Sequence, residues 1–464
     1  MEVMARSAMT MGTGGKIAEH LSVGVLAQIY PWERVSAVLQ QTNRASERVR
    51  DLPAEVVTYY VMGLGLFMAV STREVLRVLV EGLQWLGGES SVKVASEAAI
   101  SQARTRLGVA PLKRLWEQTA QPLLPVGSAG AFFGARRLVT LDGTTLDVPD
   151  TKANATHFGK PGASRGRPAF PQVRLVGLVE TGAHAVLAVA MAPYQTGEHT
   201  LAKLVVPALT ADMLCLADRL FASFSLWQQA SQTGAQLLWR VRANYRLPVE
   251  TALPDGSYLS TFYASTADQR RRTNGVRVRV VEYTLEDHPK HETYRLMTTL
   301  LDHVQAPALE LAALYPERWE MEGVFDELKT HLRGGQQVVL RSKTPALVEQ
   351  EIYGLLLAHR AVRTLMCRAA QGAQLDPDRL SFTPSVRVLR RKQAHPPAFP
   401  PPQQSARWLS SILLEILQER SVSSRGRRIP RGLKRKMSGY PLRHARAPIQ
   451  VQFHPPLIAT PSSK

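Results

Sequence analysis

The sequence predicts an α/β protein in which a mixed sheet follows a helical N-terminal region. Residues 1 to about 125 have helical patterns, whereas residues 137–241 contain three strands joined by short turns and then two helix–strand alternations. Short turns join antiparallel strands and intervening helices join parallel ones, so this order favours a mixed sheet covered by helices. Apolar residues make up 45% of the 464 residues, which supports a sizeable buried core and excludes wholesale disorder.

The N-terminal helices are predicted from apolar spacing and from one helix-start signal. The apolar run 56–70 holds 15 residues, too few to cross a bilayer, and is expected to form a buried helix. Ser71 followed by Glu74 forms a capping box, after which apolar residues recur at helical spacing. We expect residues 1–125 to form a helical N-terminal domain that binds DNA, with a packing or dimerisation role as the alternative.

The core of the predicted α/β protein is assembled from two segments, residues 130–243 and 306–371. Each element is read from a short apolar run or from helical spacing, bounded by turn residues. The expected strands span 138–142, 173–179, 185–190, 213–218 and 237–241, and the expected helices span 200–209, 225–232, 311–330 and 345–371.

A β-rich insertion, residues 244–305, interrupts this core. It contains an Asn274-Gly275 turn and the alternating stretch 276–285, a pattern typical of hairpin strands. Residues 372–464 are expected to form a Pro-containing linker followed by a basic C-terminal tail, because five of the eight residues 395–402 are prolines, a composition typical of a stiff linker.

Positive charge is concentrated towards the C-terminus. The chain carries 57 basic and 38 acidic residues, a formal net charge of +19. Residues 361–464 hold 19 basic against 4 acidic residues, and ten of these basic residues lie between Arg420 and Arg446. This distribution suits a polyanion such as DNA or RNA, with a solubilising tail as the alternative. A membrane is disfavoured, because no amphipathic helix with an aromatic face accompanies the basic stretch.

Two cysteines, Cys215 and Cys367, are too few for a disulfide scaffold or a cysteine-based zinc cluster. The first residues also lack the charged stretch and apolar core of a signal peptide. We therefore expect a cytoplasmic protein.

The candidate chemistry begins with Asp142 and Asp218, each of which follows an apolar strand. Neighbouring strand ends can bring two carboxylates to one Mg²⁺, although such aspartates also cap turns. A helix over 315–329 would add a polar stripe opposite an apolar face, because at 100° per residue four of its side chains fall within roughly 60° of one another. These four are Tyr315, Arg318, Glu322 and Lys329. The alternative for this stripe is an exposed face with ion pairs one turn apart.

The spacing Tyr-x2-Arg-x3-Glu-x6-Lys resembles the signature of transposases of the insertion-sequence-four family. Residues 141–151 resemble the family's first aspartate block and residues 214–223 its second, in the same order along the chain. Further similarity covers the helical region, at 52–56 and 100–107, and the C-terminal end, at 431–442.

This resemblance implies a ribonuclease-H-like catalytic core with a β-rich insertion, preceded by the helical domain. It implies that Asp142, Asp218 and Glu322 are the catalytic residues and the ligands of two Mg²⁺ ions, for which Mn²⁺ can substitute. Asp147 and Asp150 lie in the same block as Asp142, which is preferred because it follows the apolar strand. In relatives an aromatic of the insertion holds a flipped base, and the candidates here are Trp239, Tyr245 and Tyr258, with sheet packing as the alternative.

The same resemblance implies double-stranded DNA as the partner, both as terminal inverted repeats and as target. Tyr315, Arg318 and Lys329 are expected to bind phosphates of the transposon end, and Arg219 is a further candidate for a DNA contact. The resemblance also implies cut-and-paste transposition, with a homodimer in the end complex. We expect the protein to be associated with the nucleoid. The alternatives are a DNA-binding derivative without catalysis and a nuclease without strand transfer; the presence of all three acids disfavours the first.

Overall fold

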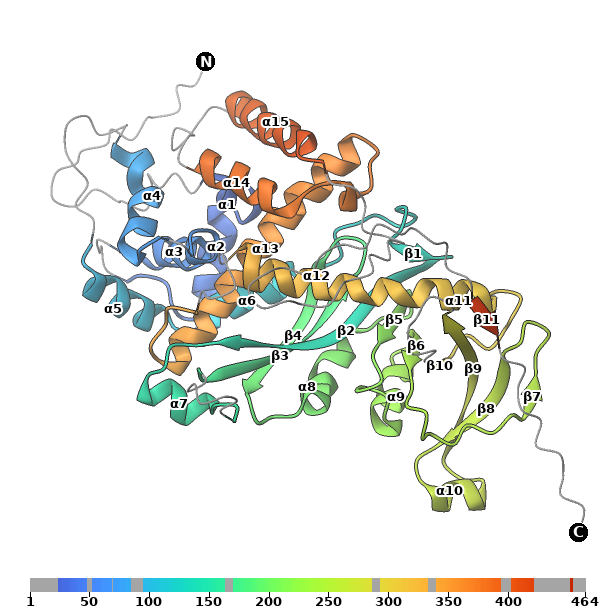
Figure 1. Ribbon diagram of the computed structural model, residues 1–464. Coiled ribbons are helices and arrows are strands. Elements are labelled where there is room, and N and C mark those ends of the chain that lie inside the picture. Colours follow the sequence, from blue (N-terminus) through green and yellow to red (C-terminus); the bar gives the residue numbers. More distant parts are fainter. Residues whose placement is uncertain are drawn as a thin grey trace, which may run out of the picture.

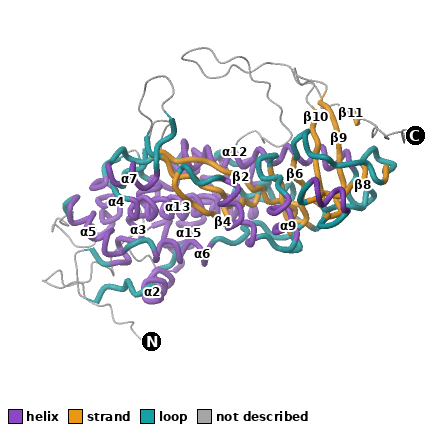
Figure 2. The backbone as a smooth tube through the Cα atoms, turned by 90° about the horizontal axis from the view of Figure 1, so that it is seen from below, coloured by secondary structure: helices purple, strands orange, loops and turns teal. Residues whose placement is uncertain are grey.

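The computed structural model is an elongated body with most of its helices at one end and an extended sheet reaching the other (Figure 1, Figure 2). The described residues are 24–47, 52–68, 70–84, 95–162, 170–285, 293–332, 339–393, 402–420 and 451–453. None of the helices in these ranges is long and apolar enough to span a membrane.

The N-terminal region is helical, as predicted. Its helices are α1 (Gly24–Ile29), α2 (Trp32–Gln41), α3 (Ala54–Leu66), α4 (Thr72–Gln84), α5 (Glu97–Leu107) and α6 (Ala110–Thr119). The expected cap of α4 is present, because the Ser71 hydroxyl accepts a hydrogen bond from the Glu74 backbone N–H at 3.2 Å. Gly108, with φ of 71°, ends α5 in a conformation that favours glycine.

Helix α3 is buried on every side and packs along α13 (Pro345–Gly372). The two backbones approach closely at glycines: a Cβ added at Gly354 would lie 2.5 Å from the Val61 carbonyl oxygen. The N-terminal helices therefore share one hydrophobic core with α13. This packing gives the region a structural role, and its binding to DNA stays a prediction.

The strands form one 11-stranded sheet in the order β4-β3-β2-β5-β6-β10-β9-β8-β7, with β1 beside β2 and β11 beside β9. The strands are β1 (Phe132–Phe133), β2 (Arg136–Asp147), β3 (Gln172–Glu180), β4 (Ala185–Pro193), β5 (Met213–Ala217), β6 (Gln236–Arg240), β7 (Thr251–Ala252), β8 (Tyr258–Tyr263), β9 (Gly275–Leu285), β10 (Thr293–Thr298) and β11 (Val451–Phe453). The β2–β5 and β5–β6 pairings are parallel and the others antiparallel. The mixed sheet that the order of strands predicted is confirmed, with the strand order and directions expected for a ribonuclease-H-like core.

The β-rich insertion continues this sheet. Its strand β10 pairs with β6, with Thr298 opposite Leu238, and β9, β8 and β7 follow outward. Helix α10 (Thr266–Arg271) connects β8 to β9. The fully buried Arg279 on β9 donates to the Asp255 carboxylate and to the Ala306 carbonyl oxygen, at 2.5 and 2.6 Å. These bonds join the insertion to the chain that returns to the core.

Helices cover both faces of the sheet. One face packs against α8 (Glu198–Val205), the short turn Val206–Ala208 and α9 (Phe224–Ser231). The other face packs against α11 (Ala308–Leu314), α12 (Glu320–Asp326) and α13, and α12 crosses the sheet in Figure 1. Helix α7 (Lys152–Phe158) lies between β2 and β3 in the chain, so the short turn predicted between the first two strands is wrong, whereas β3 and β4 are joined by a short turn as predicted.

The region after 371 differs from the prediction of a linker and tail. It contains a 3-10 turn (Pro377–Arg379), α14 (Phe382–Gln393) and α15 (Pro402–Gln418), and both helices pack near α13. Apolar residues at helical spacing explain the difference, because Val386, Leu389, Ile412 and Ile416 are buried in the shared core. Most of the proline-rich stretch and residues 421–450 of the basic tail lie outside the described residues.

Candidate active site

Asp142 and Asp218 lie side by side at the junction of two parallel strands. The register pairs Leu141 of β2 with Ala217 of β5, so the residue that follows each of them is an aspartate, Asp142 within β2 and Asp218 directly after β5. Leu138 and Leu216 pack on the face that carries α11. Because side chains alternate along a strand, both aspartates point to this same face.

One detail of the prediction is corrected here. Asp142 does not end its strand: β2 continues to Asp147 through its pairing with β3, and the strand that ends is β5. Asp147, an odd number of residues further, points to the other face and accepts a hydrogen bond from Gln172 Nε2 at 2.8 Å. Asp150 pairs with Lys160 at 2.7 Å.

Burial raises the pKa of Asp142 to about 6. The Gly143 backbone N–H, which donates to Asp142 Oδ1 at 2.8 Å, and the Arg318 guanidinium oppose this rise in the pKa, whereas Asp218 and Glu198 add to it. A hard divalent cation would compensate a carboxylate in this position, and carboxylate oxygens are the ligands that Mg²⁺ prefers. The pair Asp142 and Asp218 therefore fits a metal ion chemically.

The segment that carries the predicted polar stripe is helical but not one regular α-helix. A 3-10 turn (Tyr315–Trp319) precedes α12, and a π-helical turn (Glu327–His331) follows it. In a 3-10 turn residues i and i+3 eclipse, so Tyr315 and Arg318 project together. The Tyr315 hydroxyl donates to the Ala217 carbonyl oxygen at 3.2 Å, and Arg318 Nη1 lies 3.2 Å from Asp142 Oδ2.

The other two stripe residues diverge from this pair. Glu322 is exposed on α12, one turn beyond Arg318, and makes no hydrogen bond to Asp142 or Asp218 in this part of the described chain. Lys329 lies in the π turn, which holds more residues than an α turn and so rotates the side chains that it carries. It lines a small apolar cavity against the sheet together with Phe325 and Leu175. The segment therefore does not keep the regular α-helical spacing from which the stripe was predicted, and a phosphate contact of Lys329 stays a prediction.

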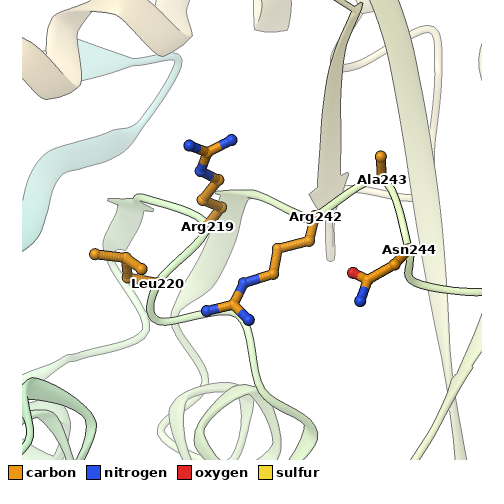
Figure 3. A pocket seen from close by; sticks show the side chains of 5 residues that line it. All are labelled: Arg219, Leu220, Arg242, Ala243 and Asn244. Carbon is orange, nitrogen blue, oxygen red and sulfur yellow. The ribbon is translucent and has the colours of Figure 1, made fainter.

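Arg219 lies at the rim of this site, in the loop that follows Asp218. It lines an open hollow of about 440 Å³ with Leu220, Arg242, Ala243 and Asn244, from the loops that follow β5 and β6 (Figure 3). The carboxyl ends of parallel strands share one edge of a sheet, which explains why these loops meet. Sequence reasoning missed Arg242, although its place just after an apolar strand gives the same signal as that of Asp218.

Glu198 is a second residue that sequence reasoning missed. It is the first residue of α8 and lies against Gly143, where an added Cβ would be 2.7 Å from its Cδ. Its carboxylate pairs with Arg174 Nη1 of β3 at 2.8 Å. No spacing in the sequence links residue 198 to residue 142, since their proximity depends on how α8 packs on the sheet.

The aromatic candidates near or inside the insertion have packing contacts in the structure. Trp239 is fully buried and meets Trp227 edge to face at 5.2 Å. Tyr258 is buried and donates to Glu282 at 2.8 Å, and the Tyr245 hydroxyl donates to the Ala222 carbonyl oxygen. These contacts are those of the alternative, sheet packing.

The chain also matches known protein families and relatives. Residues 20–117 match the family model of the insertion element 4 transposase N-terminal region, and residues 134–360 match that of the transposase DDE domain. The chain is 30% identical over 363 residues to the transposase InsG for insertion sequence element IS4 of Escherichia coli strain K12, covering 77% of this chain and 80% of that protein.

Two further similarities are more distant. The putative transposase InsZ of Escherichia coli strain K12 is 28% identical over 223 residues, covering 48% of this chain and 72% of that protein. A cryo-EM structure of the piggyBac transposase synaptic complex with hairpin DNA matches with a TM-score of 0.38 and 13% identity, over 84% of this chain and 82% of that one. On the strength of the match to InsG and of the two family models, the chain belongs to the IS4 family of DDE transposases.

Proposed function

We propose that Asp142, Asp218 and Glu322 are the acids at which this transposase cleaves and joins DNA strands. Family membership makes the chain an enzyme of DNA cleavage and strand transfer. The observation that carries the residue assignment is the shared register of Asp142 and Asp218 on β2 and β5. Glu322 joins them as an exposed carboxylate one turn from Arg318, which itself contacts Asp142.

The three acids would hold two Mg²⁺ ions, with Mn²⁺ as a substitute. Bound in this way, the ions would activate the attacking oxygen and stabilise the leaving oxygen of an in-line displacement at a phosphodiester. The oxygen-only donor set of Asp142 and Asp218 supports this proposal, as does the raised pKa of Asp142, which reflects a charge with too little compensation.

Arg318 would hold a phosphate of the transposon end. Its guanidinium lies against Asp142, and its Nε–H is buried without a hydrogen-bond partner among the described residues. A buried donor without a partner is costly, and a phosphate oxygen would satisfy it. Tyr315 donates to the Ala217 carbonyl oxygen, so its role would be to fix the helix against the strand that leads to Asp218.

The DNA would approach from the edge where β5 and β6 end. Arg219 and Arg242 line the hollow there and would contact phosphates on either side of the cleaved bond. We propose terminal inverted repeats and target DNA as the substrates, a homodimer as the form that holds paired ends, and the nucleoid as the location. Lys329, which faces the sheet, would contribute by packing or by a rearrangement of the π turn on binding.

The test is cleavage and strand transfer with labelled end DNA and a target plasmid in Mg²⁺. Asp142→Ala, Asp218→Ala and Glu322→Ala should each reduce cleavage by at least about 10³-fold while leaving end binding within a few-fold of wild type. Asp147→Ala is the matched control and should cleave normally, because its side chain points to the other face of the sheet.

The same assay separates the alternative functions. A DNA-binding derivative would show end binding without cleavage in the wild-type chain, and a nuclease would cleave without joining ends to the target. Loss of activity in Asp147→Ala together with normal activity in Asp142→Ala would contradict the choice of acid.

A further inference from the structure

Four exposed arginines lie together at the far end of the insertion. Arg270 and Arg271 are in the last turn of α10, Arg272 follows that helix, and Arg277 lies near the start of β9. Figure 1 shows α10 projecting beyond the ends of β8 and β9, away from the helical end of the molecule. We call these four residues the basic tip.

The positive charges of the basic tip are not neutralised by ion pairs. None of its four side chains makes a hydrogen bond or an ion pair within the described part of the chain. By contrast, Arg279 and Arg295 of the same insertion pair with Asp255 and Glu282, each at 2.5 Å. The insertion therefore balances positive charge along its strands but leaves the charge at its tip open to a polyanion in solution.

Asp268, the acidic residue of α10, holds the loop of the basic tip together. Its carboxylate accepts hydrogen bonds from the Ser265 hydroxyl, from Asn274 Nδ2 at 2.9 Å and from Thr273 Oγ1 at 3.3 Å. These bonds, that of Ser265 above all, lower the pKa of Asp268, and the charge of Arg271 contributes least to this effect. The carboxylate thus serves the loop more than it neutralises the arginines.

The same loop holds its arginines in a defined arrangement. Arg272 and Asn274 have φ angles of 53° and 50°, in the left-handed region that is unfavourable for residues other than glycine. Gly275 fixes the loop against β8, because a Cβ added there would clash with Thr261 and lie 2.7 Å from Tyr263 Cε1. A cluster that is ordered in advance loses less entropy on binding a ligand than a mobile one does.

The register of the sheet gives the distance from the basic tip to the candidate active site. Asp218 lies level with Arg240 of β6, since the residues before them are paired. Arg240 is paired with Leu296 of β10, and Leu296 with Val281 of β9. Val281 lies six residues after Gly275, where β9 begins. The basic tip is therefore roughly 20 Å along the strands and roughly 14 Å across them from Asp218, at about 3.3 Å per residue and about 4.8 Å per strand.

We propose that the basic tip is a second DNA-binding site, which contacts phosphates of the duplex roughly seven to nine base pairs from the cleaved bond. The direct distance of roughly 25 Å spans about seven base pairs of about 3.4 Å each, and α10 extends somewhat further. Guanidinium groups match phosphate oxygens in charge and in hydrogen-bond geometry. The position of this contact rests on the proposed function of Asp142 and Asp218. The transposon end and the DNA that flanks it present the same backbone, and the experiment distinguishes them.

A DNA-cutting iron chelate attached at Arg271→Cys locates the contact. Cys215 and Cys367 are both buried, so the label reacts with the introduced thiol. The labelled full-length chain is bound, without Mg²⁺, to end DNA that extends about two helical turns to each side of the cleaved bond. We expect cuts roughly seven to nine base pairs from that bond on one side, which identifies either the transposon end or its flank.

Leu204→Cys is the matched control for the label. Leu204 is 70% exposed on α8, a helix that packs near β3 and β4 rather than near the insertion. The chelate at this position should not cut the DNA where the chelate at Arg271→Cys does. The same cuts from both positions, or no cuts from Arg271→Cys in a chain that binds the DNA, would overturn the proposal.

Replacing Arg270, Arg271 and Arg272 together by Gln should weaken binding to the same DNA. It should also flatten the slope of log K against log salt by about two to three units, because each neutralised phosphate contributes about −0.9. Replacement of the same three residues by Lys preserves the charge and should preserve the slope. Equal slopes in the two variants would contradict the proposal and leave the catalytic proposal intact, since cleavage by the wild-type chain tests that separately. A wild-type chain that binds no end DNA would contradict both.

Discussion

At the scale of single residues, the surroundings of Asp142 shift the pH at which its carboxyl group ionises into the range of ordinary buffers. Its pKa is raised from 3.8 to about 6, first by burial. Between these two values the folded chain binds more protons at Asp142 than the unfolded chain does. The contribution of Asp142 to stability therefore falls as the pH rises from about 4 to about 6, and the penalty is fully present above that window.

Asp142→Asn should consequently stabilise the metal-free protein at pH 7 and have little effect below pH 4. The gain at pH 7 should be at most roughly 3 kcal/mol, and smaller where the contact with Arg318 is weakened. Denaturant unfolding of both proteins in a chelator, at several pH values, measures this difference. A difference that is the same at pH 4 and pH 7 would contradict the assignment of the penalty to this carboxylate.

Residues of the site differ in how far the sequence could predict them. Asp142, Asp218, Tyr315 and Arg318 were found from strand ends and from the family's spacing, and the structure brings them together. That Glu322 acts with them stays a prediction. The position of Glu198 beside Asp142 could not be predicted, because Gly143, against which Glu198 packs, lies 55 residues earlier in the chain and no local pattern records such a contact.

At the scale of single elements, helices α3 and α13 approach each other closely at Gly354. Gly354 lies against backbone atoms of Val61, which cannot rotate away as a side chain can. The long α13 in turn meets α6, α14 and α15. A shift of α13 at Gly354 would therefore disturb its packing against the other helices at this end of the molecule.

Gly354→Ala should destabilise the protein by about 1–3 kcal/mol, the usual cost of overpacking. Gly372→Ala is a matched control on the same helix, since an added Cβ there meets nothing within 4 Å. It should be neutral or slightly stabilising, because alanine has the higher helix propensity. Thermal unfolding of both variants tests the difference, and equal melting temperatures would show that the contact can relax.

Periodicity predicted most elements but not their changes of helix type. The strands from β2 to β6, the insertion strand β9 and the long helix α13 all overlap predicted stretches, although β2 extends well beyond the predicted 138–142. The 3-10 and π turns around α12 were missed, because such turns arise from packing against the sheet and leave no mark on residue spacing. The helices α14 and α15 were not predicted, because basic residues and prolines surround their apolar positions and mask the helical spacing.

For the whole molecule, the positive charge between Arg420 and Arg446 is expected to add contacts to DNA phosphates that do not depend on sequence. Each phosphate neutralised contributes about −0.9 to the slope of log K against log salt. Replacing the ten basic residues by Gln should flatten that slope by several units and weaken binding to cognate and unrelated DNA alike.

This variant is preferable to a truncation, because the chain after residue 450 returns as β11 and pairs with β9. Replacing the same arginines by Lys is the control and should preserve the slope, since it preserves the charge. Measurement of binding at several salt concentrations decides the matter, and an unchanged slope in the Gln variant would assign the tail to solubility.

Strand β10 of the insertion pairs with β6 of the core and so covers the edge of that strand. Leu237, Leu238 and Trp239 of β6 are all fully buried. Without β10 this strand would become an exposed, apolar edge with unpaired backbone groups, the kind of edge that pairs with other chains and aggregates. The insertion thus shields the catalytic sheet as well as enlarging it, and a shortened enzyme would need another cover for β6 before it could remain dispersed in solution.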